Sequence, residues 1–122
     1  MKSIHLAGLA TALSVAVGCA SAPVPTARMT SAEQAVQAAR GAGAETAPNA
    51  EAYLTRAESQ LADARQLVEE GENAEAAELL TRAEADAQLA AALSREAQQR
   101  AATDASMQRV RSMQSTPSGE SR

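Results

Sequence analysis

The chain has 122 residues and a formal net charge of −4, and 45% of its residues are hydrophobic although only 1% are aromatic. Alanine supplies 32 residues. Strands and sheet cores need branched and aromatic side chains, so this composition argues against a β-sandwich, a barrel or an α/β enzyme and favours an all-α protein.

The first residues are typical of a secretory signal peptide. Lys2 precedes a mostly apolar run over residues 4–17, which Gly18 and the only cysteine, Cys19, follow. The run has about 14 residues, whereas a membrane-spanning helix needs about 20. We therefore expect residues 1–18 to be a cleaved signal peptide and favour this over a retained membrane anchor.

The end of this segment, residues 16–19 (Ala-Val-Gly-Cys), resembles the lipobox of bacterial lipoproteins. The resemblance implies cleavage between Gly18 and Cys19 and attachment of acyl chains, palmitate among them, to Cys19. Because Ala20 and not Asp follows, it also implies an outer-membrane anchor facing the periplasm. A cut after Ala22 instead would release a soluble periplasmic protein, although Pro23 disfavours that cut.

The mature chain lacks most residue types that perform catalysis. Its basic residues are all arginine, and it contains no Lys, His, Trp or Phe. No Ser-His or Cys-His pair is left for nucleophilic catalysis, and no His/Cys set for a zinc or copper site. We expect a protein without enzyme activity, cofactor, metal or small-molecule substrate. Acid/base chemistry by carboxylates such as Glu58 and Glu84 is the alternative.

Nucleic acid is also an unfavourable partner for this sequence. The chain is acidic and has a single aromatic residue, Tyr53, so it offers neither a basic surface nor a platform for stacking bases. We expect Tyr53 to pack against the helices, and a role as an anchor for a protein partner is the alternative.

Three further regions follow the signal peptide. Residues 19–29, which include two prolines, predict a lipidated cysteine on a flexible, disordered tether. Residues 30–105 have helical periodicity and predict one helical domain. Residues 106–122 contain Ser, Gln, Met, Gly and Pro without a sustained period and predict a disordered tail.

A short helix is predicted over about residues 31–42. Thr30 and Glu33 have the spacing of a capping box, and Gly41 and Gly43 are expected to end the helix. Four apolar residues then share one face: Ala32, Ala35, Val36 and Ala39.

An antiparallel helical hairpin is predicted over about residues 48–70 and 74–103. Pro48 suits a first helical turn, Gly71 a helix end, and Asn73 an N-cap, so the connection is tight. Inward positions alternate by fours and threes on both helices, as in a coiled-coil seam. They are Ala50, Leu54, Ala57, Leu61, Ala64 and Val68, and then Ala76, Leu80, Ala83, Ala87, Ala90, Ser94, Ala97 and Ala101.

One short segment recurs within the hairpin. Residues 54–58 (Leu-Thr-Arg-Ala-Glu) are repeated at 80–84. The Leu and Ala of each copy lie on a seam, so we attribute the repeat to the helical pattern that both helices share. Duplication of a segment, or a binding code, is the alternative. Glu-Arg pairs four residues apart, at 78/82 and 96/100, predict solvated helix faces and not a docking patch.

Together, these features make the chain resemble small bacterial lipoproteins that carry an uncharacterised Ala/Glu-rich helical-hairpin domain. The likeness covers about residues 31–103, where a segment at 57–64 leads through a Gly-Glu turn into another at 76–80. It implies fold and location but no activity.

We expect a structural or protein-interaction module of the cell envelope, held on the membrane by the lipid on Cys19. Alanine methyl groups stabilise a core weakly, so a partner surface is expected to help. That partner is another envelope protein or a second copy of the chain. The alternative is a self-assembling coiled-coil spacer whose third helix pairs with copies of itself.

Overall fold

The structure is a computed structural model that describes residues 22–115. Three helices make up most of this range: α1 (Thr26–Gly41), α2 (Glu51–Glu70) and α3 (Asn73–Ser115). Residues 22–115 contain no strand. The predicted all-α class, with a short helix before a helical hairpin, is confirmed.

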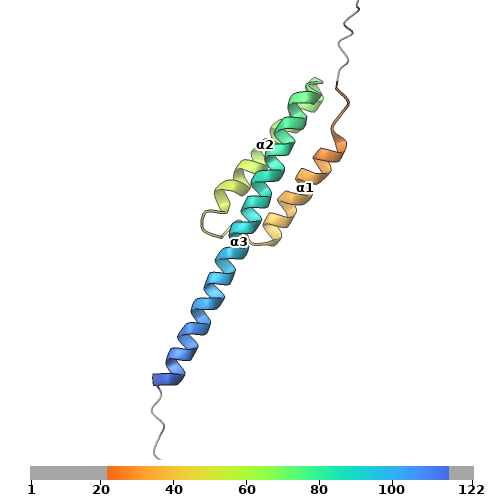
Figure 1. The fold of residues 1–122 in the computed structure, drawn as a ribbon. Coiled ribbons are helices and arrows are strands. Elements are labelled where there is room, and N and C mark those ends of the chain that lie inside the picture. Colours follow the sequence, from red (N-terminus) through yellow and green to blue (C-terminus); the bar gives the residue numbers. More distant parts are fainter. Residues whose placement is uncertain (1–21, 116–122) are drawn as a thin grey trace, which may run out of the picture.

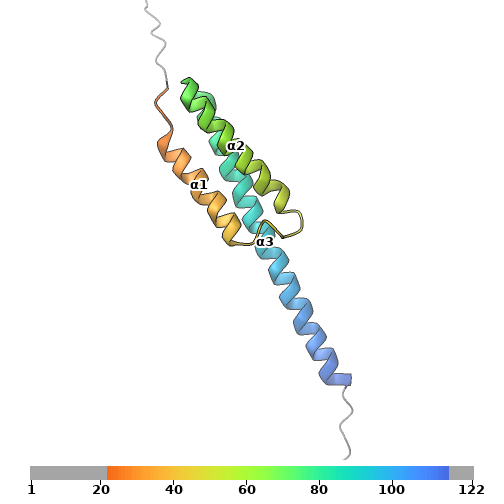
Figure 2. The same ribbon diagram turned by 180° about the vertical axis from the view of Figure 1, so that it is seen from behind.

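The helices form a bundle along the first half of α3. Figures 1 and 2 show α1 and α2 flanking that half, with α1 parallel to α3 and α2 antiparallel to both. α3 packs against both of the other helices, whereas α1 and α2 contact each other much less. The second half of α3 continues alone beyond the loop that joins α1 to α2. We call residues 95–115 the arm.

The core lies where the predicted seams meet, and most of it is alanine. Leu80 and Ser94 are its largest fully buried side chains, and the Ser94 hydroxyl donates to the Ala90 carbonyl at 2.8 Å. Small side chains let the helix backbones approach closely, which increases dispersion contacts per residue. The buried residues are Ala32, Val36, Ala39, Ala44, Ala50, Leu54, Ala57, Leu61, Ala64, Ala76, Leu80, Ala83, Ala87, Ala90, Ala91 and Ser94.

Most predicted inward positions are thus confirmed, with four exceptions. Ala35, Val68 and Ala97 are only half-buried. Ala101 is exposed, so its assignment to the seam was wrong. The reason is that the second half of α3 extends beyond α1 and α2 (Figure 1), so it has no other helix of the chain to pack against.

Gly71 ends α2 as predicted. It has a φ of 84°, a left-handed conformation that glycine adopts without steric cost. The Gly71 N–H donates to the Val68 carbonyl at 3.1 Å, and the Glu72 N–H donates to the Leu67 carbonyl at 2.8 Å. These two bonds make a Schellman motif, which reverses the chain into α3. Gly43, with a φ of 79°, ends α1 in the same way.

α1 begins earlier than predicted. It starts at Thr26, so residues assigned to the tether are helical. Thr30 lies inside the helix, where its hydroxyl donates to the Thr26 carbonyl at 3.1 Å, and it does not cap the helix. Proline precedes the first turn at Pro25, and Met29 packs against the core. The early start follows from both, because proline suits a helix start and Met29 gains burial.

The other two helices also differ from the predicted bounds. α2 begins at Glu51 and not at Pro48, because Asn49 has a φ of 64° and cannot continue a helix there. α3 continues to Ser115, so residues 106–115 of the predicted tail are helical. The signal peptide, Cys19 and residues 116–122 lie outside the described residues.

Candidate functional site

The predicted cleavage and lipidation residues, Gly18 and Cys19, lie outside the described residues, but the chain that follows them is placed. Ala22 is three residues after Cys19. Its backbone carbonyl accepts a hydrogen bond of 2.7 Å from Nδ2 of Asn73, the first residue of α3. Asn73 therefore does not act as the expected N-cap. Its side chain holds the N-terminal segment beside the turn between α2 and α3.

The N-terminal segment and the start of α3 enclose a shallow apolar cleft. Its walls are residues 22–28 on one side and Asn73, Ala74 and Ala77 on the other. Val24 leaves half of its surface exposed here. Asn73 Oδ1 is buried without a hydrogen-bond partner in the structure. This end of the molecule thus has an exposed apolar surface, and the N-terminal segment is held beside it by the hydrogen bond from Asn73 to Ala22.

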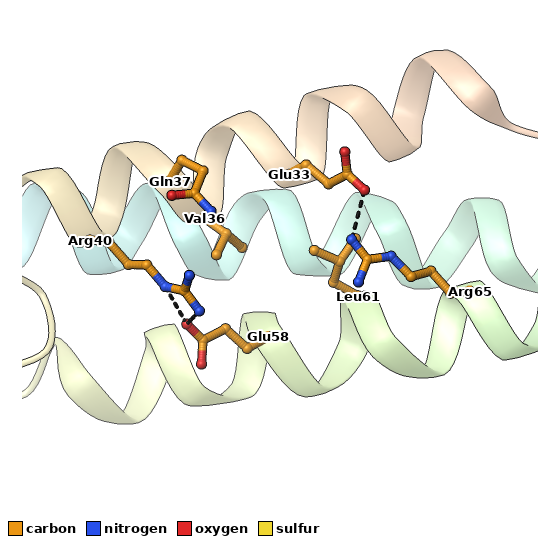
Figure 3. Close-up of a pocket in the computed structure, with 7 residues that line it drawn as sticks. All are labelled: Glu33, Val36, Gln37, Arg40, Glu58, Leu61 and Arg65. Carbon is orange, nitrogen blue, oxygen red and sulfur yellow. Dashed lines mark hydrogen bonds and ion pairs between the residues drawn. The ribbon is translucent and has the colours of Figure 1, made fainter.

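A second hollow, shown in Figure 3, lies between α1 and α2. Val36 and Leu61 line it with apolar side chains. Ion pairs cross it on both sides: Glu33 binds Arg65 at 2.7 Å, and Arg40 Nη2 lies 2.6 Å from Glu58 Oε1. These pairs join two helices that otherwise touch little.

The charged side chains on the two sides of this hollow are paired with each other. Each of its carboxylates, on Glu33 and Glu58, is bound by an arginine. Glu58 and Glu84, the two candidates for acid/base chemistry, have different partners, because Glu84 accepts a hydrogen bond from Gln88 on its own helix at 3.0 Å. The arrangement therefore fits a connection between helices.

A third polar cluster joins α2 to α3. Asp86 accepts a hydrogen bond from Gln60 Nε2 at 3.1 Å and lies 3.6 Å from Arg56 Nη1. The Arg56 guanidinium also lies over the Tyr53 ring, 5.2 Å from its centre, a cation–π contact. Tyr53 is half-buried and packs against the core, which agrees with the packing role expected for it.

The repeated segments take equivalent places in α2 and α3. Leu54 and Ala57 of the first copy and Leu80 and Ala83 of the second are all buried in one core. The shared pattern thus serves the packing of the two helices against each other.

The arm is exposed to solvent, and its last part, residues 106–115, is helical where the sequence predicted a disordered tail. All of its residues except the half-buried Ala97 are exposed, and three of them are large and apolar: Met107, Val110 and Met113. A run of good helix formers (Ala, Gln, Arg, Met) was the signal that could have predicted it. No helix within residues 22–115 is long and apolar enough to cross a membrane. The same residues contain no cluster of His, Cys, Asp or Glu suited to a metal ion.

One comparison with known proteins finds a relationship. A family model described as "Domain of unknown function (DUF4398)" matches residues 27–106, which is more than half of the chain and covers α1 from its second residue, all of α2, and α3 as far as residue 106 in the arm. No curated protein and no solved structure matches the chain significantly.

Proposed function

We propose that this chain, which belongs to the DUF4398 family of domains of unknown function, is a non-enzymatic lipoprotein of the cell envelope. In this proposal, acyl chains on Cys19 anchor it to the periplasmic face of the outer membrane. The bundle is a rigid base, and the arm is the surface offered to a protein partner.

The position of Ala22 is the main observation that supports an anchor at this end of the bundle. Three residues from Cys19 to Ala22 span about 10 Å at most. Because Asn73 binds Ala22 at the α2–α3 turn, a lipid on Cys19 would hold this end of the bundle at the membrane. The arm leaves the bundle at the opposite end (Figure 1), so within one chain it lies far from that chain's own attachment point.

The apolar cleft at the N-terminal end suits the same placement. Val24 and its neighbours would lie next to the bilayer surface, where burial of apolar area adds to the acyl chains. Two or more acyl chains give stable attachment, whereas one gives only marginal binding. This is the physical reason to expect anchoring without a membrane-spanning helix.

The alternative of a spacer that assembles through the seam of the third helix has less support. Its seam residues from Ala76 to Ser94 are covered by α1 and α2 of the same chain. Pairing through this seam would require the bundle to open. The exposed face of α3 is not covered by α1 or α2, so another molecule can contact it without opening the bundle.

Lipidation is tested by growing cells that express the full chain with a labelled fatty acid. We expect label on the parent chain and none on Cys19→Ala, with the chain recovered in the outer-membrane fraction. Ser21→Ala is the matched control and is expected to keep the label. An unlabelled parent chain, or label that survives in Cys19→Ala, would overturn the anchor. A chain in the soluble periplasmic fraction would favour secretion without lipid.

A further inference from the structure

Besides its buried seam, α3 has a stripe of exposed residues on the side that faces away from α1 and α2. Its positions recur every three or four residues, so they lie along one side of the helix. All of them are exposed, and the stripe continues without a break from the bundle into the arm. They are Ala85, Leu89, Ala92, Glu96, Arg100, Thr103, Met107 and Val110.

Charge is divided unequally along the molecule. Residues 22–94 contain twelve acidic and five basic side chains, whereas the arm contains two acidic and four basic ones. The bundle is therefore strongly acidic and the arm basic. Opposite charges at the two ends of one elongated molecule favour pairing between copies that run in opposite directions.

We propose that this stripe is the contact surface of an antiparallel dimer of the chain, in which the arm of each copy lies along the bundle of the other. The stripe is self-complementary about residue 98. Leu89 and Met107 are equally far from this centre, so each would meet the other across the interface. Glu96 and Arg100, which already bond within one helix, would also meet across it in reciprocal pairs.

We favour the antiparallel direction because a parallel pair would bring like charges together. A parallel pair places arm beside arm, bundle beside bundle and Glu96 beside Glu96, and all three are like-charge contacts. The antiparallel pair replaces each of them by an opposite-charge contact. It also buries Leu89, 41% exposed, against Met107, 54% exposed, while Ala85 and Ala92 allow close approach of the helices. Such a two-fold contact is closed and stops at the dimer.

This dimer has a consequence for the anchored protein, and in that respect it rests on the proposed function. The two copies of Asn73 would lie about 75 Å apart at 1.5 Å per residue of helix. Lipids at both ends reach one membrane only when the dimer lies along its surface. The contact surface itself does not involve Cys19, so the dimer and the anchor can fail independently.

Disulfide crosslinking of the full chain in cells tests the dimer. Differently tagged Leu89→Cys and Met107→Cys chains are co-expressed, oxidised and separated by mass. We expect a mixed crosslink between the two tags and little crosslinking of either variant expressed alone, because identical positions would be about 27 Å apart along the axis. Leu89→Cys paired with Ala105→Cys is the control, since residue 105 lies on the opposite side of the helix.

Each competing arrangement of the chains would give its own crosslinking pattern. Crosslinking of the single variants would show a parallel pair, crosslinking to a different protein would show another occupant, and a yield equal to the control would show no contact. Each of these results overturns the proposal. Crosslinking of the parent chain through Cys19 would contradict lipidation and not the dimer, since the stripe excludes residue 19.

A charge exchange gives a second readout with little risk to the fold, because both side chains are exposed. We expect Arg100→Glu to lower the yield of the Leu89–Met107 crosslink several-fold, since Glu96 of one copy would then face a like charge. Adding Glu96→Arg to the same chain restores reciprocal pairing and should restore the yield. An unchanged yield in Arg100→Glu, or no recovery in the double exchange, would contradict the proposed register.

Discussion

Asn73 donates a hydrogen bond from Nδ2 to the carbonyl oxygen of Ala22 at 2.7 Å, across 51 residues of sequence. This bond ties the N-terminal segment to the start of α3. It fixes where the chain enters the bundle and therefore which end a lipid on Cys19 would hold.

The variant Asn73→Ala tests that connection. We expect the free energy of unfolding to fall by about 1 kcal/mol, the usual net worth of one hydrogen bond. Hydrogen exchange should rise at residues 22–28 while the core of α3 keeps its protection. Glu72→Ala, at an exposed neighbouring position, is the control and should change neither quantity. Unchanged exchange at 22–28 in Asn73→Ala would show that other contacts hold the segment.

Two glycines in similar open surroundings should respond in opposite directions to alanine. Neither Gly41 nor Gly71 has an atom within 4 Å of an added Cβ, so only the backbone decides. Gly71→Ala should lower the free energy of unfolding by about 1 kcal/mol, because its φ of 84° is left-handed. Gly41→Ala should raise it by about 0.5–1 kcal/mol, since Gly41 is helical. Urea unfolding measures both, and changes of the same sign would contradict the assigned helix ends.

Leu80 is the largest apolar side chain that is fully buried. We expect Leu80→Ala to lower the free energy of unfolding by about 2–5 kcal/mol, because it removes apolar contacts and leaves a cavity in the core. Met113→Ala is the control, since Met113 is 63% exposed on the arm. Its effect should stay within about 0.5 kcal/mol. Equal effects of the two substitutions in thermal or urea unfolding would place the core elsewhere.

The ion pair between Glu33 and Arg65 is expected to contribute little despite its length of 2.7 Å. Both side chains are about half exposed, so solvent screens the pair and the coupling should be about 0.2–1 kcal/mol. A double-mutant cycle of Glu33→Ala and Arg65→Ala measures it. Raising the salt to about 1 M should remove most of the coupling. A coupling that survives in high salt would indicate a pair that is shielded from solvent.

The core could be predicted from the sequence because periodicity decides which side of a helix is buried. To predict the seam from Leu54 to Ala64 and from Ala76 to Ser94, we needed only the helical repeat and the scarcity of larger apolar residues. Gly71 was also predictable, because few residues adopt its conformation. Family membership agrees with this part of the fold, since the match ends at residue 106, near the end of the predicted domain.

The sequence did not predict the start of α1, the ion pairs between helices or the full length of α3. These features depend on contacts between distant residues or on the continuation of a helix. The capping-box pattern at Thr30 was overridden because Met29 packs on the core and extends α1. Partners such as Glu33 with Arg65 lie on different helices, and spacing along one helix cannot reveal them. The arm packs against no other helix of its own chain, so the buried apolar seam does not continue along it. An established helix nevertheless extends at low cost once nucleated.

Anchoring of an envelope protein through Cys19 can be read from the intact mass of the full chain purified from cell membranes. We expect a protein that begins at Cys19 and carries the added mass of its acyl chains. An unmodified cysteine in a chain that begins at residue 1, or a chain that begins at Pro23 without lipid, would contradict it.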